Sequence, residues 1–297
     1  PILSNGGTTR GLPISCFLNY VPDSRGGLSS HYDENIWLAS SGGGIGGYWG
    51  DIRSNGIATA NNSRSTGSIP FMKVVDSQML AFNQGITRRG SYAAYMDIDH
   101  PEIEEFINIR KESGGDINRK CLNLHNGINL TNEFLQAVKN DDDWRLIDPK
   151  TKEAVKIVSA RELWWQILNA RAETGEPYLI NIDTCNEALP KGQKDLGLEI
   201  KQSNLCSEIT LPTNDERTAV CCLSSVNLTK WNEWKNTDLV ETAIYFLDGV
   251  LEEFLAKTSG RESLQRAHRS AKKGRAIGLG VLGWHTFLQE KRIPFNL

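Results

Sequence analysis

The sequence predicts an α/β fold with a largely parallel sheet or barrel at its centre. Two observations lead to this prediction. Segments of strand length alternate with segments of helix length along the chain, and 297 residues suffice for one large α/β domain or two modest ones. The composition is that of an ordinary globular protein, with 39% hydrophobic and 23% charged residues. The sequence contains no internal repeat, no low-complexity tract and no clear domain boundary.

Five short segments are expected to form strands. Each is apolar or alternating, and each is bounded by glycine, proline or polar residues. They are residues 16–21, 92–97, 123–130, 178–182 and 219–228.

Helices are expected where apolar residues recur at helical spacing. In Pro101–Lys111, proline and acidic residues come first and basic residues come last, which is typical of a helix. The expected helices span residues 29–40, 69–84, 101–111, 131–140, 159–174, 238–258 and 263–290. The polar segments 1–15, 54–68 and 183–203 are expected to be loops.

Charge and hydropathy exclude several kinds of protein. No apolar run is long enough to cross a membrane, and no signal peptide stands at the start. The net charge of -3 argues against a nucleic-acid partner, which would require an excess of basic residues. We expect a cytoplasmic protein, because a secreted disulfide scaffold would be smaller and denser in cysteine. Because the chain begins at Pro1 without a methionine and ends at Leu297 just after a helical pattern, we also expect a piece of a longer protein.

The six cysteines are scattered, and none forms a Cys-x-x-Cys pair, so no structural metal site is expected. A free cysteine is more often a small buried hydrophobic residue than a reactive group. We interpret Cys121, Cys185 and Cys222 in this way. The other three, Cys16, Cys206 and Cys221, lie on or just after extended segments, and an α/β barrel can bring such positions together at one face.

Cys206 has polar neighbours at a spacing of two, in the pattern Asn204-x-Cys206-x-Glu208. Residues two apart in an extended segment point the same way, so the amide, thiol and carboxylate can face one small site. The thiol can give or take a hydrogen atom, and the carboxylate can take a proton from a hydroxyl. Taken alone, this short pattern also fits an ordinary buried cysteine.

Three motifs together resemble the large subunit of ribonucleotide reductases. Residues 203–213 (SNLCSEITLPT) resemble the finger loop of that family. Ser15-Cys16 followed by Asp23-Ser24 resembles its first barrel strand, and residues 221–228 resemble the strand after the finger loop. The motifs occur in the family's order and at about its spacing, and the resemblance runs from near Pro1 to the end of the chain.

This resemblance implies a ten-stranded α/β barrel made of two five-stranded halves. Residues 1–297 would form a partial catalytic barrel domain, with the first half, the finger loop at about 203–213 and the opening strand of the second half. The family's N-terminal cone domain, the tyrosine pair that receives the radical and the C-terminal cysteines have no counterpart in this sequence. We therefore expect the chain alone to be inactive.

The resemblance also implies catalytic roles. Cys206 would become a thiyl radical and remove the 3′ hydrogen of the ribose. Glu208 would act as base on the 3′ hydroxyl, and Asn204 would hydrogen-bond the ribose. Cys16 and Cys221 would supply two electrons and finish as a disulfide, while the 2′ hydroxyl leaves as water.

The glycine-rich segment 41–50 has two interpretations. Clustered glycines indicate positive φ or a close approach, and the resemblance implies that backbone approaches the substrate here, at Gly44, with Ser15 near the substrate phosphates. The pattern Gly42-x-Gly44-x-x-Gly47 also fits a dinucleotide-binding loop of an unrelated oxidoreductase. That alternative requires a strand before Gly42, where we expect a helix.

The resemblance further implies a regulatory site for a dNTP or ATP. Asp23 would hold the ribose or base region of the effector, and Arg53 would hold its phosphates, which a guanidinium group matches in geometry. A second loop would relay the identity of the effector to the choice of substrate, and a solvated basic turn is the alternative for either of its arginines. The expected effector-binding residues are Asp23, Ser24, Arg53, Gln84, Arg88 and Arg89.

No cofactor is expected in this chain, and the resemblance implies several partners. In a class I enzyme, which we favour, the radical comes from a metal-containing small subunit and the substrate is a ribonucleoside diphosphate. A second large subunit would complete a homodimer, and thioredoxin or glutaredoxin would act as reductant. A class II enzyme that uses adenosylcobalamin stays open as an alternative, as does a non-catalytic nucleotide-binding module. For a viral protein, the location would be the host cytoplasm.

Overall fold

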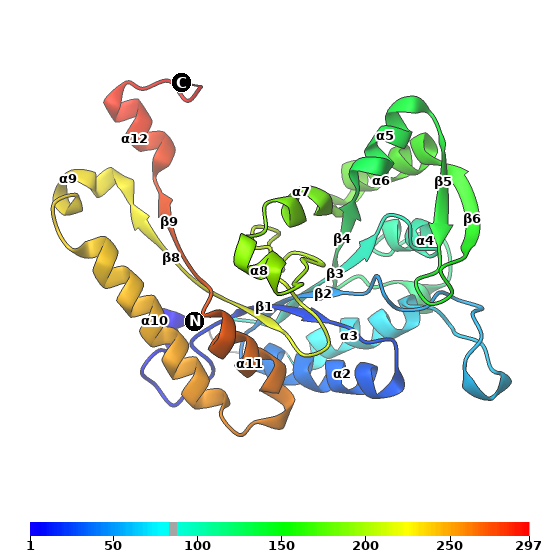
Figure 1. Cartoon of the computed structure of the whole chain (residues 1–297), viewed down its shortest axis with the longest axis horizontal. Helices are drawn as coiled ribbons and strands as arrows, with labels where there is room; N and C mark the ends of the chain where they lie inside the picture. Colours follow the sequence, from blue (N-terminus) through cyan, green and yellow to red (C-terminus); the bar gives the residue numbers. More distant parts are fainter. Residues whose placement is uncertain (83–87, 297) are drawn as a thin grey trace.

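A curved seven-stranded sheet forms the centre of the computed structural model, which describes residues 1–82 and 88–296 (Figure 1). The order of the strands is β7-β4-β3-β2-β1-β8-β9. They are β1 (Cys16–Tyr20), β2 (Gly44–Tyr48), β3 (Ser91–Asp97), β4 (His125–Leu130), β7 (Tyr178–Asn181), β8 (Ala219–Asn227) and β9 (Ile277–Leu282). A separate antiparallel hairpin consists of β5 (Asp143–Ile147) and β6 (Ala154–Ser159).

The strands of the main sheet change direction once. β7, β4, β3, β2 and β1 run parallel to one another. β8 lies antiparallel to β1, and β9 lies parallel to β8. The predicted α/β barrel class is confirmed, with the five strands of one half present. The other half contributes two strands, β8 and β9, where one was predicted.

Helices pack on the sheet and extend beyond it. The longer ones are α2 (Arg25–Ser40), α3 (Ile69–Ala81), α5 (Asn132–Asn140), α6 (Ala160–Thr174), α10 (Leu239–Thr258), α11 (Gln265–Gly274) and α12 (Trp284–Lys291). The shorter ones are α1 (Ile2–Asn5), α4 (Ile103–Ile107), α7 (Ile182–Glu187), α8 (Lys191–Asp195) and α9 (Trp231–Trp234). Within the described ranges, none of these helices combines the length and apolar character needed to span a lipid bilayer.

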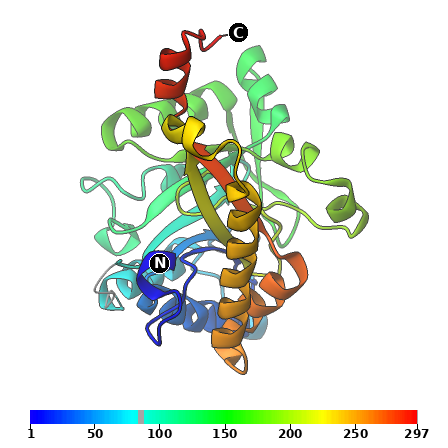
Figure 2. The same ribbon diagram turned by 90° about the vertical axis from the view of Figure 1, so that its left-hand side faces the viewer.

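The two faces of the sheet have different coverings, because side chains alternate along each strand. Phe17 of β1 packs against Phe254 of α10, with ring centroids 6.1 Å apart. α2 and α3 lie below the sheet in Figure 1, and α10 lies in front of β8 and β9 in Figure 2. Cys16 and Leu18 point to the other face, where Leu18 packs with Cys221. That face is therefore free for the loop that connects α8 to β8.

The glycine-rich segment forms β2, a strand that was not predicted because glycine is unfavourable in strands. All five residues of β2 are buried. A Cβ atom on Gly46 would lie 2.2 Å from the main-chain oxygen of Ser203, and one on Gly44 would lie 2.8 Å from the side chain of Leu205. The absence of side chains thus lets the finger loop pack directly on the strand. The segment before Gly42 is α2, so the strand that a dinucleotide-binding loop requires is not there.

Several elements differ from the prediction. The predicted helix 263–290 is divided into α11, β9 and α12, and the breaks fall at Arg275 (φ 44°) and Gly283 (φ 75°). The predicted helix Pro101–Lys111 is helical only over α4, and the predicted loop 183–203 contains α7 and α8. The hairpin β5–β6, between two correctly predicted helices, was not predicted.

Candidate active site

Two free thiols face each other where the sheet changes direction. Cys16 is the first residue of β1, and its partner across the antiparallel pair is Cys221 of β8. Residues directly opposite in such a pair have Cα atoms about 4.5–5.5 Å apart, which lies within the disulfide range of about 4.4–6.8 Å. The neighbouring Cys222 points to the helical face, where its thiol donates to the main-chain oxygen of Leu247 at 3.4 Å. The pair is therefore Cys16 with Cys221.

The finger loop is connected to this pair by a fully buried amide. Asn204 donates from Nδ2 to the sulfur of Cys16 at 3.1 Å. Its Oδ1 accepts from the backbone N–H groups of Glu208 and Ile209, each at 3.0 Å. One side chain thus shapes the turn that carries Cys206 and fixes its position beside the thiol pair.

A cavity of about 460 Å³ opens over these residues. Cys206 and Glu208 lie exposed in it. Arg88 donates from Nη1 to the hydroxyl of Ser15 at 2.9 Å, which brings a cation to the edge of the cavity. Among the lining residues are all seven that were expected at the catalytic and substrate sites: Ser15, Cys16, Gly44, Asn204, Cys206, Glu208 and Cys221.

The thiols differ in acidity. A hydrogen bond from Cys221 lowers the pKa of Cys16, whereas the same bond, together with burial, raises the pKa of Cys221 well above its ordinary value. Partial burial, followed by the charge of Glu208, raises the pKa of Cys206. Cys206 therefore keeps its S–H hydrogen at neutral pH, while Cys16 is the thiol of the pair that forms a thiolate more readily.

A second cavity, of about 500 Å³, lies beyond the other end of β1. Asp23, Ser24 and Arg53 line it, and Arg53 contacts Asp23 with Nε 2.8 Å from the carboxylate. Ser24 also caps α2 by accepting from the backbone of Gly27. Arg64, which was not singled out from the sequence, lines the same cavity. The structure thus brings together three of the six expected effector-binding residues.

The other three residues lie elsewhere. Arg88 lies in the first cavity, and Arg89 is exposed and lines neither of these two cavities. Gln84 lies outside the described residues. Because segment 83–87 separates α3 from Arg88, the connection between the two cavities along this loop stays a prediction.

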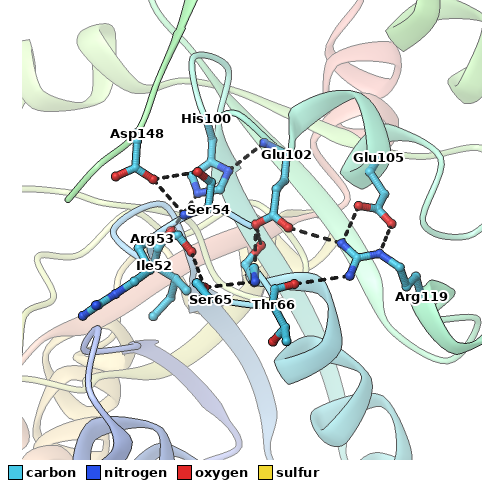
Figure 3. Close-up of polar contacts among 12 residues, drawn as sticks. Ile52, Arg53, Ser54, Ser65, Thr66, His100, Glu102, Glu105, Arg119 and Asp148 are labelled. Carbon is cyan, nitrogen blue, oxygen red and sulfur yellow. Dashed lines mark hydrogen bonds and ion pairs between the residues drawn. The ribbon is translucent and has the colours of Figure 1, made fainter. Parts of the chain in front are cut away.

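The loop 52–68, which forms one wall of the second cavity, is anchored at its start (Figure 3). Ser54 donates to the carboxylate of Asp148 from its backbone N–H at 2.8 Å and from its hydroxyl at 2.7 Å. The ring of His100 lies 2.8 Å from the main-chain oxygen of Ile52. Asp148 and His100 are both buried, so these contacts are shielded from water.

The end of the same loop is anchored by a second buried carboxylate (Figure 3). Glu102 accepts from the backbone and hydroxyl of Ser68, at 2.7 and 2.9 Å. Arg119 contacts Glu102 and donates to the main-chain oxygen of Thr66, each at 3.3 Å. Sequence reasoning missed these anchors because their partners are far apart along the chain, and Asp148 follows the unpredicted strand β5.

In the part of the chain that the structure describes, no three His, Cys, Asp or Glu side chains are grouped as a metal site. The first cavity brings together the thiols of Cys16, Cys206 and Cys221, the carboxylate of Glu208, the amide of Asn204 and the guanidinium group of Arg88. The five parallel strands correspond to one half of an α/β barrel, and β8 and β9, which run in the opposite direction, belong to the other half. The facing thiols lie where the two halves meet.

Comparisons with known proteins agree with this class. The family "Ribonucleotide reductase, barrel domain" matches residues 14–297. A Frog virus 3 protein, provisionally named a ribonucleoside-diphosphate reductase large subunit, is 50% identical over 100% of this chain and 51% of its own length. The large subunit of Invertebrate iridescent virus 3 is 42% identical over 100% of this chain and 54% of its own. The class Id ribonucleotide reductase alpha subunit of Actinobacillus ureae matches with a TM-score of 0.84 and 38% identity, over 100% of this chain and 52% of that chain.

The chain belongs to the ribonucleotide reductase family, and it corresponds to the barrel domain of the large subunit. It spans about half the length of each of these three relatives.

Proposed function

We propose that the protein containing this chain reduces ribonucleotides to 2′-deoxyribonucleotides, with ribonucleoside diphosphates as substrates. One observation carries the proposal: Cys16 and Cys221 face each other beside a loop that presents Cys206 and Glu208 to the same cavity. The names of the relatives, which specify diphosphates, support the choice of substrate.

In this proposal Cys206 acts first. A thiyl radical on Cys206 takes the 3′ hydrogen of the ribose while Glu208 takes the proton of the 3′ hydroxyl. The 2′ hydroxyl leaves as water with a proton from the thiol pair. Cys16 and Cys221 together give two electrons and two protons and become a disulfide; one proton leaves in the water and the other becomes the new hydrogen on C2′. Glu208 returns its proton to the 3′ oxygen, and Cys206 returns the hydrogen to C3′. Asn204 holds the finger loop against Cys16 throughout, which its hydrogen bonds support.

The second cavity is the proposed effector site. Arg53 would contact the phosphates of a dNTP or ATP, and Asp23 and Ser24 would contact its sugar or base. The loop of residues 84–89 would connect this site to the first cavity, which Arg88 lines. The cationic side chains Arg53 and Arg64 in one cavity support an anionic ligand.

The protein is also proposed to act with a small subunit, a second large subunit and a reductant. We propose that residues 1–297 are a part of one catalytic barrel domain. A metal-containing small subunit supplies the radical, and the large subunit forms a homodimer. Thioredoxin or glutaredoxin restores the thiols. The class Id structural relative supports class I, and the viral relatives support a site of action in the host cytoplasm.

Replacement of Cys206 tests the proposal in the full-length protein with its small subunit. Cys206→Ser removes the S–H group and should reduce turnover of ribonucleoside diphosphates to background. The affinity for a dNTP, measured by isothermal titration calorimetry, should be unchanged because Cys206 and Arg53 line different cavities. Cys185→Ser, a substitution of a partly exposed cysteine of α7, is the control and should retain turnover. Turnover by Cys206→Ser would remove Cys206 from its role.

A further inference from the structure

Behind the facing thiols, a buried carboxylate connects the two strands that carry them. Glu34 of α2 is 1% exposed. It accepts hydrogen bonds from the side-chain amide of Asn19 at 3.2 Å and from the hydroxyl of Thr218 at 2.9 Å. Asn19 belongs to β1, and Thr218 immediately precedes β8. The paired register ends at Leu18 with Ala219, and its continuation by one residue would place Asn19 opposite Thr218. One carboxylate therefore holds a residue of β1 and the residue that leads into β8.

A buried arginine of α11 also binds the carboxylate of Glu34. Arg266 of α11 donates from Nη2 to Glu34 at 2.8 Å and from Nη1 to the main-chain oxygen of Tyr20 at 3.3 Å. Both charged side chains are almost fully buried. Burial raises the pKa of Glu34, and the charge of Arg266 opposes that shift. Breaking such a buried pair costs more than breaking an exposed one, so the contact between α2 and α11 is held firmly.

The pairing of β1 with β8 requires such support because it is short. It comprises three residue pairs, from Cys16 with Cys221 to Leu18 with Ala219. A slip by one residue would turn every side chain of a strand to the other face. It would place Cys222, a second thiol, opposite Cys16 in place of Cys221.

We propose that Glu34 is a positioning residue for the redox pair: by holding Asn19 and Thr218 opposite each other, it selects Cys221 over Cys222 as the partner of Cys16. The inference rests on the proposed function, in which Cys16 and Cys221 are oxidised to a disulfide. The carboxylate acts through the strand register and takes no part in the chemistry.

The test is the choice of disulfide partner in the purified chain. The chain is equilibrated with glutathione and glutathione disulfide at defined ratios and alkylated, and its disulfides are located by tandem mass spectrometry. Two protein thiols lose two electrons and two protons, and one glutathione disulfide becomes two glutathione thiols. In the wild-type chain, Cys16–Cys221 should be the main intramolecular disulfide of Cys16.

Thr218→Val removes the hydroxyl that donates to Glu34 and keeps the shape of the side chain. The equilibrium constant for the Cys16–Cys221 disulfide should fall by about threefold or more, because only the molecules in the correct register can form it. A Cys16–Cys222 disulfide should accumulate in its place. Thr218→Ser keeps the hydroxyl and should restore the wild-type result.

Two further variants distinguish a change of strand register from a general loss of stability. Glu34→Gln removes the charge and should produce the same change of partner. Asp76→Asn replaces another buried carboxylate, which binds the backbone of Asn123 and Leu124, and should leave the disulfide unchanged.

The outcomes are distinct. If Thr218→Val forms Cys16–Cys221 as the wild type does and no product with Cys222, the role of Glu34 is overturned. If the wild-type chain itself forms no Cys16–Cys221 disulfide, the proposed redox pair fails instead. Where Glu34→Gln does not fold, the comparison of Thr218→Val with Thr218→Ser decides.

Discussion

At the scale of single residues, two carboxylates near the end of β3 have surroundings that favour their protonated forms. Asp97 is half-buried, and its carboxylate accepts from the hydroxyl of Tyr48 and from the amide of Asn129. Burial raises the pKa of Asp97. Burial, followed by the charge of Asp97, raises the pKa of Asp99 to about 6 from 3.8. Both groups therefore bind a proton more tightly in the folded chain than in the unfolded chain.

The raised pKa of Asp99 makes the free energy of unfolding depend on pH. Between about pH 4 and pH 6 the folded chain holds this proton and the unfolded chain does not, so the free energy of unfolding falls as the pH rises through this window. Asp99→Asn removes the titrating group and should raise the free energy of unfolding at pH 7.5 by on the order of 2 kcal/mol. At pH 4 the variant and the wild type should match. Urea denaturation at both pH values measures this, with Asp143→Asn at an exposed position as control; equal stability at pH 7.5 would contradict the prediction.

Residues within local motifs could be proposed from the sequence pattern itself, whereas the pairing of Cys16 with Cys221 came only from the family resemblance and other distant contacts were not predicted. Asn204, Cys206 and Glu208 lie within five positions of one another, so a short pattern indicates them. Arg88 contacts Ser15 across 73 positions of the chain. Glu34 meets Thr218 across 184 positions, and no local pattern indicates such a contact. The catalytic roles themselves remain predictions, because geometry places these residues together without testing what they do.

At the scale of elements, β2 and the finger loop depend on each other. The main-chain oxygen of Ser203 occupies the space in which a side chain of Gly46 would lie. Tyr95 of β3 donates from its hydroxyl to the main-chain oxygen of Asn204 at 2.5 Å. The loop is thus held by its backbone against the sheet, which leaves the side chains of Cys206 and Glu208 free to face the cavity.

A methyl group at Gly46 should disrupt this contact. Gly46→Ala should displace the finger loop and lower the free energy of unfolding by roughly 2 kcal/mol, since overpacking forces the backbone to shift. Limited proteolysis should then cleave the loop faster than in the wild type. Gly249→Ala in α10 is the matched control, because its new methyl group meets nothing within 4 Å; it should be neutral or stabilising by up to about 1 kcal/mol. A Gly46→Ala chain as stable as the wild type would show that the contact is not tight.

The elements that the sequence predicted are those with an uninterrupted apolar period, such as β1, α5 and α6. β9 was missed because a strand with glycine at Gly278 and Gly280 has few side chains to define its period. The signal that could have found it is the series of glycines at Gly274, Gly278, Gly280 and Gly283, which is unfavourable within one long helix. β6 was missed because its residues are mostly exposed, so burial imposes no strong pattern on them.

At the scale of the whole molecule, the two cavities lie at opposite ends of β1. Ser15 and Cys16 mark one end, and Asp23 and Ser24 follow the other. Five strand residues span about 16 Å. Among the described residues, the two sets of lining residues have no member in common. A ligand in one cavity therefore does not directly touch the described residues that line the other.

The separation predicts that nucleotide affinity and thiol chemistry can be altered independently. Arg53→Ala should weaken the binding of dTTP by about tenfold, as expected for the loss of charge-assisted hydrogen bonds. Isothermal titration calorimetry measures the affinity, and formation of the Cys16–Cys221 disulfide in the same variant should be unchanged. Arg275→Ala removes an arginine that pairs with Asp248 and Glu252, away from both cavities, and serves as control. Unchanged dTTP affinity in Arg53→Ala would place the effector elsewhere.

The position of the thiol pair has one more consequence, which concerns the unfolded chain. Cys16 and Cys221 are neighbours in space but are 205 positions apart in sequence. A disulfide between them would close most of the chain into one ring and would restrict the unfolded ensemble by about 5 kcal/mol of chain entropy. Each oxidation would thus make the barrel harder to unfold, and each reduction would remove that protection. The catalytic cycle would therefore also be a cycle in resistance to heat, denaturant and proteolysis.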